Sequence, residues 1–405
     1  MPYNSRVASR RFGASSAYSS SRSGGRRPQQ KRGPKKDYIH PSRFVKAAKP
    51  VEEATYTATH SFGDFAMHPL VATNIGLKGF TIPSPIQDKA IPLGLQGKDI
   101  IGIANTGTGK TVAFAVPVLH RLLENRSSSV LIIAPTRELA QQIEQEFRAL
   151  GRGTGLFGAL LIGGAGMGPQ LRDLRVNPQI VIGTPGRIKD HIERRTLNLS
   201  NFDTVVLDEV DRMLDMGFID DVRSILQELA PERQSFFFSA TMDYKVEELI
   251  RTFSNEPITI SVSTGTTTDS VHQDIVCYET INDKIEQLHD LLNKADVTKA
   301  IVFDDTQRAV ERLSKELQAR GFKADDIHGG KTQGQRQRAL DRFKKDQVTV
   351  LVATDVAARG IDVADVSHVI NYSTPQNYET YIHRIGRAGR AGNIGHALTF
   401  VTEKY

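Results

Sequence analysis

Short apolar runs alternate with longer amphipathic stretches along most of the 405 residues, and this alternation constrains the fold more than any other feature. Strands that alternate with helical patterns indicate a parallel sheet with helices on both faces, which is an α/β architecture. The strands predicted in the first half are residues 99–103, 130–133, 180–182, 204–207 and 236–238. Amphipathic helices are expected over 112–123 and 138–150, directly after the first two strands.

A segment rich in Ser, Thr and Gly, SVSTGTTTDS (261–270), interrupts this alternation and has no apolar periodicity. A second series follows it, with strands predicted at 299–303, 348–352, 368–372 and 397–401 and a helix over 309–320. A chain of this length usually forms more than one core. We therefore predict a tail over 1–60, a first domain over 61–261, a linker over 262–270 and a second domain over 271–405.

The basic charge is concentrated in the N-terminal tail. Residues 1–50 contain 13 Lys and Arg and a single acid, Asp37, so they carry +12, whereas the rest of the chain carries −6. The tail is rich in Ser, Gly and Pro and has little apolar surface to bury, so we predict disorder to about residue 60. Three roles are compatible with it: a solvated arm, an arm that neutralises nucleic-acid phosphates, or an organellar transit peptide.

Composition excludes two other classes of protein. No apolar run approaches the roughly 20 residues of a membrane-spanning helix, so no membrane association is expected. Cys277 is the single cysteine, which rules out an intrachain disulfide and a cysteine-cluster zinc site. We predict a cytoplasmic protein.

A glycine-rich loop, ANTGTGKT (104–111), joins the first strand to a helix. Its glycines allow backbone N–H groups to surround phosphate oxygens at a helix N-terminus, with Lys110 toward the β- and γ-phosphates and Thr111 toward Mg²⁺. The strand 204–207 ends in Asp208 and Glu209, which suit a metal ligand and a base for water. The alternatives are an unliganded glycine turn and a solvated acidic turn.

These motifs and others occur in the order found in the DEAD-box ATP-dependent RNA helicases, which the chain resembles from about Phe62 to Tyr405. The motifs are GFTIPSPIQ (79–87), ANTGTGKT (104–111), APTRELAQQ (134–142), Gly163-Gly164, TPGR (184–187), DEVD (208–211), SAT (239–241), IVFDDT (301–306), TQGQR (332–336), ATDVAARGID (353–362) and HRIGRAGR (383–390). The resemblance implies two RecA-like domains in tandem and RNA-dependent hydrolysis of ATP.

The resemblance also implies an ATP site. Gln87 would read the adenine edge, Phe80 would stack on the base, and Asp362 would contact the ribose. Phe62, an isolated aromatic upstream, matches an additional packing residue of the family. The loop residues Thr106, Gly107, Thr108, Gly109, Lys110 and Thr111 would hold the phosphates. Arg387 and Arg390 would act as arginine fingers on the transferred phosphoryl group, which requires the two domains to close.

RNA is implied to lie across both domains, held through its sugar–phosphate backbone without sequence preference. The corresponding first-domain residues are Pro135, Thr136, Arg137, Gly164, Thr184, Gly186 and Arg187. Those of the second domain are Thr306, Gln333, Arg336, Thr354 and Gly360. Hydrogen bonds among Asp211, Ser239, Thr241 and His383 are expected to couple hydrolysis to RNA binding.

The chain departs from the family pattern at several positions. Val210 replaces Ala in the name-giving motif, Asn105 replaces Gln, and Asp304-Asp305 replace less acidic residues. Because both active carboxylates remain, hydrolysis is expected to be retained. The sequence stops at Tyr405, where family members normally continue into a further helix, so no auxiliary RNA-binding domain is expected on that side.

The leading hypothesis is a monomeric ATP-dependent RNA helicase that opens short duplexes or remodels ribonucleoprotein. The alternatives are an ATP-gated RNA clamp or annealing chaperone that unwinds little, and a DNA-directed helicase. The tail distinguishes the first two, because +12 of charge could promote annealing as readily as tethering.

Overall fold

The computed structural model describes residues 39–48, 56–105, 107–262, 270–358, 363, 365–389 and 394–402, and the structural statements below concern these residues. Residues 1–38 and 49–55 of the predicted tail and 263–269 of the predicted linker lie outside them. None of the described helices has the length and apolar character needed to cross a membrane.

The first domain is built from residues 62–261. Its strands are β1 (Ile100–Ile103), β2 (Val130–Ile133), β3 (Gly158–Leu161), β4 (Ile180–Gly183), β5 (Thr204–Asp208), β6 (Gln234–Ser239) and β7 (Ile258–Ser261). Its helices are η2 (Phe62–Asp64), α1 (Pro69–Leu77), α2 (Pro85–Leu95), α3 (Lys110–Glu124), α4 (Arg137–Leu150), α5 (Met167–Arg175), α6 (Pro185–Glu193), α7 (Val210–Asp215), α8 (Ile219–Gln227) and α9 (Tyr244–Phe253).

The second domain spans residues 271–402. Its strands are β8 (Val271–Tyr278), β9 (Ala300–Phe303), β10 (Ala324–Ile327), β11 (Val350–Ala353), β12 (His368–Asn371) and β13 (Gly395–Thr402). Its helices are α10 (Ile281–Leu292), α11 (Gln307–Ala319), α12 (Gln333–Lys344), α13 (Asp355–Ala358) and α14 (Tyr378–Ile385), and η1 (Pro41–Phe44) packs on the same domain.

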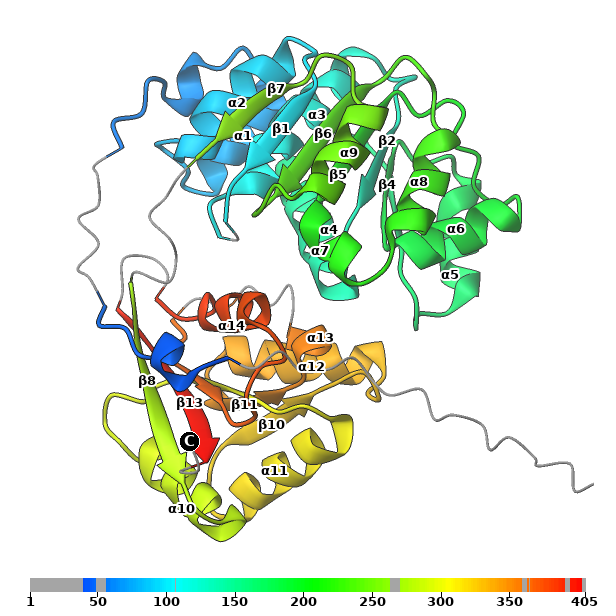
Figure 1. The fold of residues 1–405 in the computed structure, drawn as a ribbon. Helices are drawn as coiled ribbons and strands as arrows, with labels where there is room; N and C mark the ends of the chain where they lie inside the picture. Colours follow the sequence, from blue (N-terminus) through cyan, green and yellow to red (C-terminus); the bar gives the residue numbers. More distant parts are fainter. Residues whose placement is uncertain are drawn as a thin grey trace, which may run out of the picture. The chain divides into compact units, whose positions relative to one another are not determined.

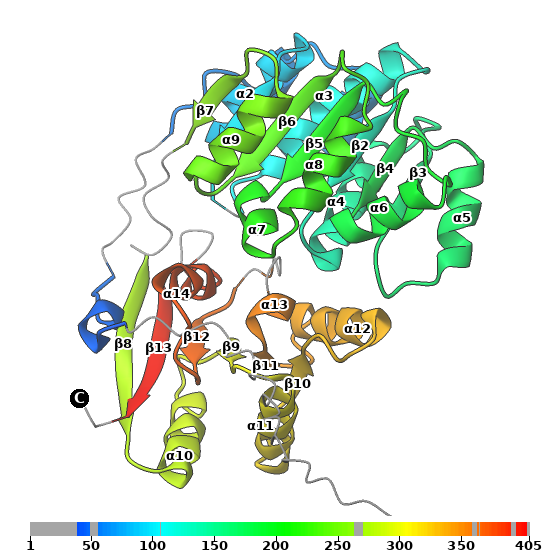
Figure 2. The same cartoon turned by 45° about the vertical axis from the view of Figure 1, so that its right-hand side comes forward.

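Each domain contains one sheet whose strand pairs are all parallel (Figures 1 and 2). The strand order is β3-β4-β2-β5-β6-β1-β7 in the first domain and β10-β11-β9-β12-β13-β8 in the second. Central strands such as β2 (VLII) and β11 (VLVA) are buried along their whole length, as expected for a parallel sheet covered on both faces. The predicted α/β fold with two parallel sheets is confirmed.

Helices cover both faces of each sheet and form a separate apolar core on each side. In the first domain, helices α1 to α4 bury Ile75, Ile91 and Phe114 on one face. Helices α5 to α9 bury residues such as Ile188 and Val222 on the other face. In the second domain, α12 to α14 cover one face, and α10 and α11 cover the opposite one. Because the strands of each sheet are parallel, their carboxyl ends lie at one edge of that sheet, where the connecting loops bring functional side chains together.

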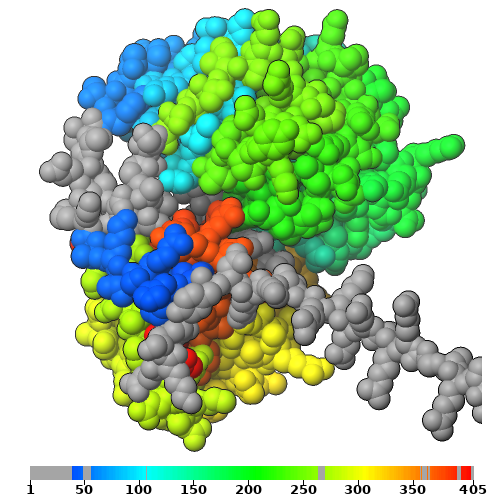
Figure 3. All heavy atoms as spheres, in the orientation of Figure 1, coloured from blue at the N-terminus to red at the C-terminus, as the bar shows by residue number. Residues whose placement is uncertain are grey.

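The structure differs from the predicted 1–60 tail for residues 39–48, which pack on the second domain. Phe44 is fully buried, with its ring centroid 4.7 Å from that of Tyr381, and Ile39 joins the same core. Lys46 exchanges two backbone hydrogen bonds with Gln273 on β8. Strand β8 is the edge strand of the described sheet, with β13 on one side, and Lys46 binds to its other side. Figure 3 shows this segment in dark blue against yellow-green β8. Two apolar residues and an open strand edge thus order a segment whose composition predicts disorder.

Replacing Phe44 by Ala is expected to release this segment. Truncating a buried Phe to Ala costs about 3–5 kcal/mol, and a loss of about 3 kcal/mol raises the population of the open segment roughly 100-fold. Hydrogen exchange of residues 39–48 in the full chain measures the effect. The matched control is Val45→Ala, because Val45 is 51% exposed and its truncation should change exchange little. Equal exchange in both variants would show that Phe44 does not hold the segment.

Candidate active site

The glycine-rich loop lies between β1 and α3, at the carboxyl end of its strand. Gly107 has φ +84° and Gly109 has φ +87°, a left-handed conformation that side-chain-bearing residues rarely adopt. A Cβ added at Gly109 would clash with the side-chain amide of Gln87. The loop therefore needs glycine twice, and α3 begins directly at Lys110 with its N-terminal N–H groups available for an anion.

The side chain of Gln87 is bonded to this loop. Its Nε2 donates to the Gly109 carbonyl at 3.0 Å, and its Oε1 accepts from the Ser84 N–H at 2.9 Å. Ser84 Oγ also donates to the Thr108 carbonyl at 2.7 Å. Ser84 and Gln87 form the capping box of α2, which explains why the amide turns toward its own chain. The expected adenine contact thus competes with hydrogen bonds that hold the phosphate loop.

Phe80 lines the pocket that also contains Gly107, Lys110 and Glu209. Its ring centroid lies 6.1 Å from that of Phe62, which is buried, and Lys78 Nζ lies 5.4 Å from the Phe80 centroid. Phe62 therefore packs against Phe80 and supports its ring at the wall of the pocket.

One buried lysine and two buried carboxyl side chains meet where β5 ends beside the glycine-rich loop. Lys110, Asp208 and Glu209 are 5%, 2% and 4% exposed, and Lys110 Nζ lies 3.8 Å from Asp208 Oδ1. Lys110 Nζ, Asp208 Oδ1 and Glu209 Oε1 have no hydrogen-bond partner among the described residues. Glu209 also has φ +57°, which is strained for a residue with a side chain. Buried polar atoms left unpaired destabilise a fold, so this arrangement suits a bound ligand that supplies their partners.

The environment gives the two carboxyl groups different proton affinities. Burial raises the pKa of Asp208 to about 6, although the charge of Lys110 opposes this. Burial acts in the same sense on Glu209, but Arg212 and Lys110 together hold the pKa of Glu209 below its usual value. Glu209 is therefore ionised at neutral pH.

Sequence reasoning missed Arg212, whose Nη1 donates to Glu209 Oε2 and which is itself buried. The two residues are three apart, at the start of α7, where side chains of one helical turn meet. That spacing directly after DEVD was the available signal for the ion pair.

The predicted coupling residues of the first domain form one hydrogen-bonded group. Asp211 Oδ2 accepts from the Thr241 N–H at 2.9 Å and from Thr241 Oγ1 at 3.1 Å. Ser239 Oγ accepts from the Asp211 N–H at 3.3 Å and donates to the Thr241 carbonyl at 2.7 Å. Since β5 and β6 are adjacent strands, the segments after them meet directly. The fourth predicted member, His383, lies on α14 of the second domain.

The first-domain residues expected to contact RNA lie after the ends of the adjacent strands β2, β3 and β4. The Arg137 guanidinium lies against Gly164, which has φ +75°, and a Cβ at Gly164 would clash with it. Arg187 Nη1 donates to the Ala165 carbonyl at 3.2 Å. Thr136 and Thr184 precede the N-termini of α4 and α6, with Pro135 before the first and Gly186 within the first turn of the second. The sheet thus assembles two arginines and two helix N-termini along one edge.

The corresponding second-domain residues follow the ends of β9, β10 and β11, which are neighbours. Thr306 is the N-cap of α11, Gln333 begins α12, and Thr354 precedes α13. Arg336 lies within α12 and is buried. Four predicted site residues lie outside the described residues: Thr106, Gly360, Asp362 and Arg390.

Arg387, the described candidate finger, follows the end of α14 and is buried. Arg384, which sequence reasoning did not assign, fixes this helix through two hydrogen bonds to Asp355 at 2.6 and 2.8 Å. It also donates to the Ser373 carbonyl at 2.8 Å. Arg384 thus joins the HRIGRAGR motif to the ATDVAARGID motif.

The two parallel sheets, the glycine loop and the buried Lys–Asp–Glu cluster define a phosphate-loop nucleotide hydrolase. Two family models match the chain: DEAD/DEAH box helicase over residues 84–250 and helicase conserved C-terminal domain over 283–392. The chain belongs to the DEAD-box family of ATP-dependent RNA helicases.

Curated relatives agree with this assignment. The ATP-dependent RNA helicase CshA of Listeria monocytogenes is 46% identical over 342 residues, which are 84% of this chain and 66% of that protein. The DEAD-box ATP-dependent RNA helicase CshA of Bacillus subtilis is 44% identical over 347 residues, 85% of this chain and 70% of that protein. The chain thus spans about two thirds of the length of these relatives.

Solved structures show the same fold. S. cerevisiae Dbp5 bound to RNA and ADP BeF3 matches with a TM-score of 0.76 and 31% identity, over 85% of this chain and 90% of that one. Mss116p bound to ssRNA and AMP-PNP matches with a TM-score of 0.76 and 30% identity, over 85% of this chain and 75% of that one. The expected RecA-like fold of both domains is confirmed.

Proposed function

We propose that the chain hydrolyses ATP to ADP and phosphate when it binds RNA, and that this reaction opens short RNA duplexes or remodels ribonucleoprotein. The observation that carries the proposal is the buried cluster of Lys110, Asp208 and Glu209, whose unpaired atoms lie beside the glycine loop. A nucleoside triphosphate with its cation would supply anionic oxygens to Lys110 Nζ and a metal ligand position for Asp208 Oδ1, the atoms that have no hydrogen-bond partner among the described residues.

Thr111 and Asp208 would hold Mg²⁺, because a hydroxyl and a carboxylate are oxygen ligands of the kind this ion prefers. When bound, the ion would neutralise charge on the β- and γ-phosphate oxygens. The unpaired Asp208 Oδ1, buried beside Lys110, supports this fit.

Glu209 would orient the attacking water and accept its proton. The Arg212 guanidinium holds one carboxylate oxygen, Oε2, which leaves Oε1 free of hydrogen bonds to described residues. The water would bind at Oε1. Arg387 and Arg390 would stabilise charge on the phosphoryl group once RNA and ATP bring the two domains together, so that hydrolysis depends on both ligands.

RNA would be held by Arg137, Arg187 and the N-termini of α4 and α6 in the first domain, and by residues around Thr306, Gln333 and Thr354 in the second. Guanidinium groups and helix N-termini bind phosphates without reading bases. This supports sequence-independent binding and local strand separation. The cytoplasmic location and the monomeric state stay predictions from the sequence.

The test is a pair of assays on the full chain with a short RNA duplex. We expect ATP hydrolysis to require RNA, and strand displacement to require hydrolysable ATP. A chain that hydrolyses ATP with RNA but displaces no strand would be the ATP-gated clamp instead. Stimulation by DNA oligomers equal to that by RNA would favour the DNA-directed alternative.

The basic segment before Ile39 is expected to provide the salt-sensitive part of RNA affinity. Residues 1–38 contain ten Lys and Arg and one acid, a formal charge of +9, whereas the chain after residue 50 is acidic. The logarithm of RNA affinity falls as the logarithm of salt concentration rises. For single strands, each phosphate that the protein no longer neutralises makes this slope less negative by about 0.7. Deleting residues 1–38, which leaves the packed segment intact, should therefore flatten the slope measured by RNA titration. An unchanged slope would show that this charge does not contact RNA.

A further inference from the structure

Three histidines of the second domain stand side by side on neighbouring strands. In the parallel register, His368 of β12 is opposite His396 of β13, and His396 is opposite His272 of β8. Residues in register on parallel strands point to the same face of the sheet. The three imidazoles therefore form a row across the strands, near their amino ends.

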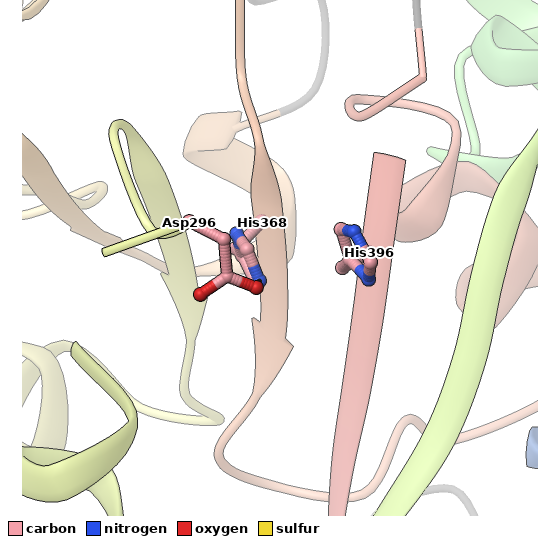
Figure 4. Close-up of side chains that lie close together, drawn as sticks. All are labelled: Asp296, His368 and His396. Atoms are coloured by element: carbon pink, nitrogen blue, oxygen red, sulfur yellow. The ribbon is translucent and has the colours of Figure 1, made fainter. Parts of the chain in front are cut away.

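The histidine rings are in direct contact. The rings of His368 and His396 are nearly parallel, with centroids 4.8 Å apart and 11° between their planes. His272 meets His396 edge to face at 5.7 Å. Asp296, from the loop between α10 and β9, adds a carboxylate to the first pair (Figure 4). One donor atom from each of Asp296, His368 and His396 lies within 4.8 Å of the other two.

Hydrogen bonds around Ser367 determine which nitrogen of His368 faces Asp296. Ser367 Oγ donates to the Lys299 carbonyl at 3.0 Å, so its proton is already used. Ser367 Oγ also accepts from the Thr298 and Lys299 N–H groups, both at 3.1 Å, and it lies 3.1 Å from His368 Nδ1. Nδ1 is therefore occupied by this contact, and Nε2 is the ring nitrogen turned toward Asp296, with a lone pair in the tautomer protonated at Nδ1. Orientation of one ring nitrogen by a hydrogen bond at the other is typical of metal-binding histidines.

The Nε2 lone pair faces a negative group. Nε2 lies 3.8 Å from Asp296 Oδ2, too far for a hydrogen bond. A cation held between these two atoms would need a separation only slightly shorter than this one.

We propose that Asp296, His368 and His396 bind one divalent transition-metal ion of the zinc class. Two imidazoles and one carboxylate are a donor set suited to such ions, rather than to Mg²⁺ or Ca²⁺. With metal–nitrogen bonds of about 2.0–2.1 Å, the donors of a tetrahedral site lie about 3.3 Å apart. The two imidazoles have to turn out of their parallel arrangement so that both lone pairs point at the ion. The side chain of Asp296 is 60% exposed and can move to close the remaining distance, and water completes the coordination.

The site is separate from the nucleotide and RNA residues. His368 begins β12 and His396 is the second residue of β13, whereas Thr306 and Thr354 follow the carboxyl ends of β9 and β11. In a parallel sheet these are opposite edges. The ion would tie the loop before β9 to the starts of β12 and β13, and so stabilise the second domain without entering the reaction.

Titration of the metal-free full chain, with any affinity tag removed, tests the proposal. Co²⁺ is the probe, followed by its absorption bands, and Zn²⁺ is added in competition. The exposed Cys277 is changed to Ser in every protein, which removes thiol binding. We expect one Co²⁺ per chain, displaced by Zn²⁺, and a rise in thermal stability with Zn²⁺.

Asp296→Asn and His396→Ala are each expected to weaken Co²⁺ affinity by at least tenfold. Ser367→Ala should weaken it by about 10–100-fold, because the ring is then no longer oriented. The matched control is His289→Gln, because this histidine of the same domain meets Phe322 edge to face outside the cluster, and the variant should bind as the parent does. Circular dichroism of each variant separates a binding defect from a folding defect. Affinity that is equal in the Asp296→Asn and control proteins, or no Co²⁺ binding by the parent, would overturn the proposal.

Discussion

Replacing Glu209 by Gln is expected to reduce RNA-stimulated ATP hydrolysis about 10²- to 10⁴-fold, the contribution typical of a general base. Glutamine keeps the size of the side chain but cannot accept a proton from water. ATP and RNA binding should persist, because Lys110, the glycine loop and the RNA-contact edge are unchanged. Single-turnover hydrolysis with saturating RNA measures the chemical step directly.

The ion pair with Arg212 has to be controlled for. Removing one partner of a buried pair typically costs about 3–5 kcal/mol of stability, so the free energy of unfolding of Glu209→Gln must be measured as well. Glu228→Gln, at the exposed end of α8, changes a carboxylate of the same domain away from the site and should hydrolyse ATP normally. A folded Glu209→Gln protein with undiminished turnover would exclude Glu209 as the base.

Gly109→Ala is expected to lower ATP affinity about 10- to 100-fold. The new methyl group would clash with the Gln87 amide and force the loop away from its hydrogen bond with Gln87. Overpacking of this kind costs about 1–3 kcal/mol, and each 1.4 kcal/mol changes affinity tenfold. Equilibrium binding of a fluorescent ATP analogue provides the measurement.

The matched control for this prediction is Gly153→Ala. Gly153 has φ +77°, so alanine suffers similar backbone strain there, but a Cβ at this position meets no neighbouring atom within 4 Å. Gly153→Ala should therefore reduce stability and leave ATP affinity unchanged. An equal decrease of affinity in both variants would mean that general strain, rather than contact with Gln87, explains the effect.

The sequence predicts those parts of the molecule that local pattern determines. Buried strands such as β2 and β11 read as continuous apolar runs, and the glycine loop follows its strand directly. Asp208 and Glu209 follow a run of buried residues, and parallel topology brings them beside the loop. Each of these inferences depends on residues close together in the chain or on the general geometry of a parallel sheet.

Partnerships between distant residues could not be predicted in this way. Arg384 reaches Asp355 across 29 positions, and Phe44 is buried against Tyr381, which is hundreds of residues away. Gln87 turns toward Gly109 because both of its polar groups find partners there, which the motif alone does not reveal. The histidine row depends on the register of β12, β13 and β8, which the sequence does not specify.

The central claim is that the Lys110–Asp208–Glu209 cluster performs hydrolysis of ATP that depends on RNA. The most direct test is the steady-state ATPase rate of the full chain with no nucleic acid, with an RNA oligomer, and with DNA of the same sequence. We predict hydrolysis that rises strongly with RNA only, and that is abolished in Lys110→Ala. A folded chain whose rate is unaffected by RNA, or is retained in Lys110→Ala, would contradict the claim.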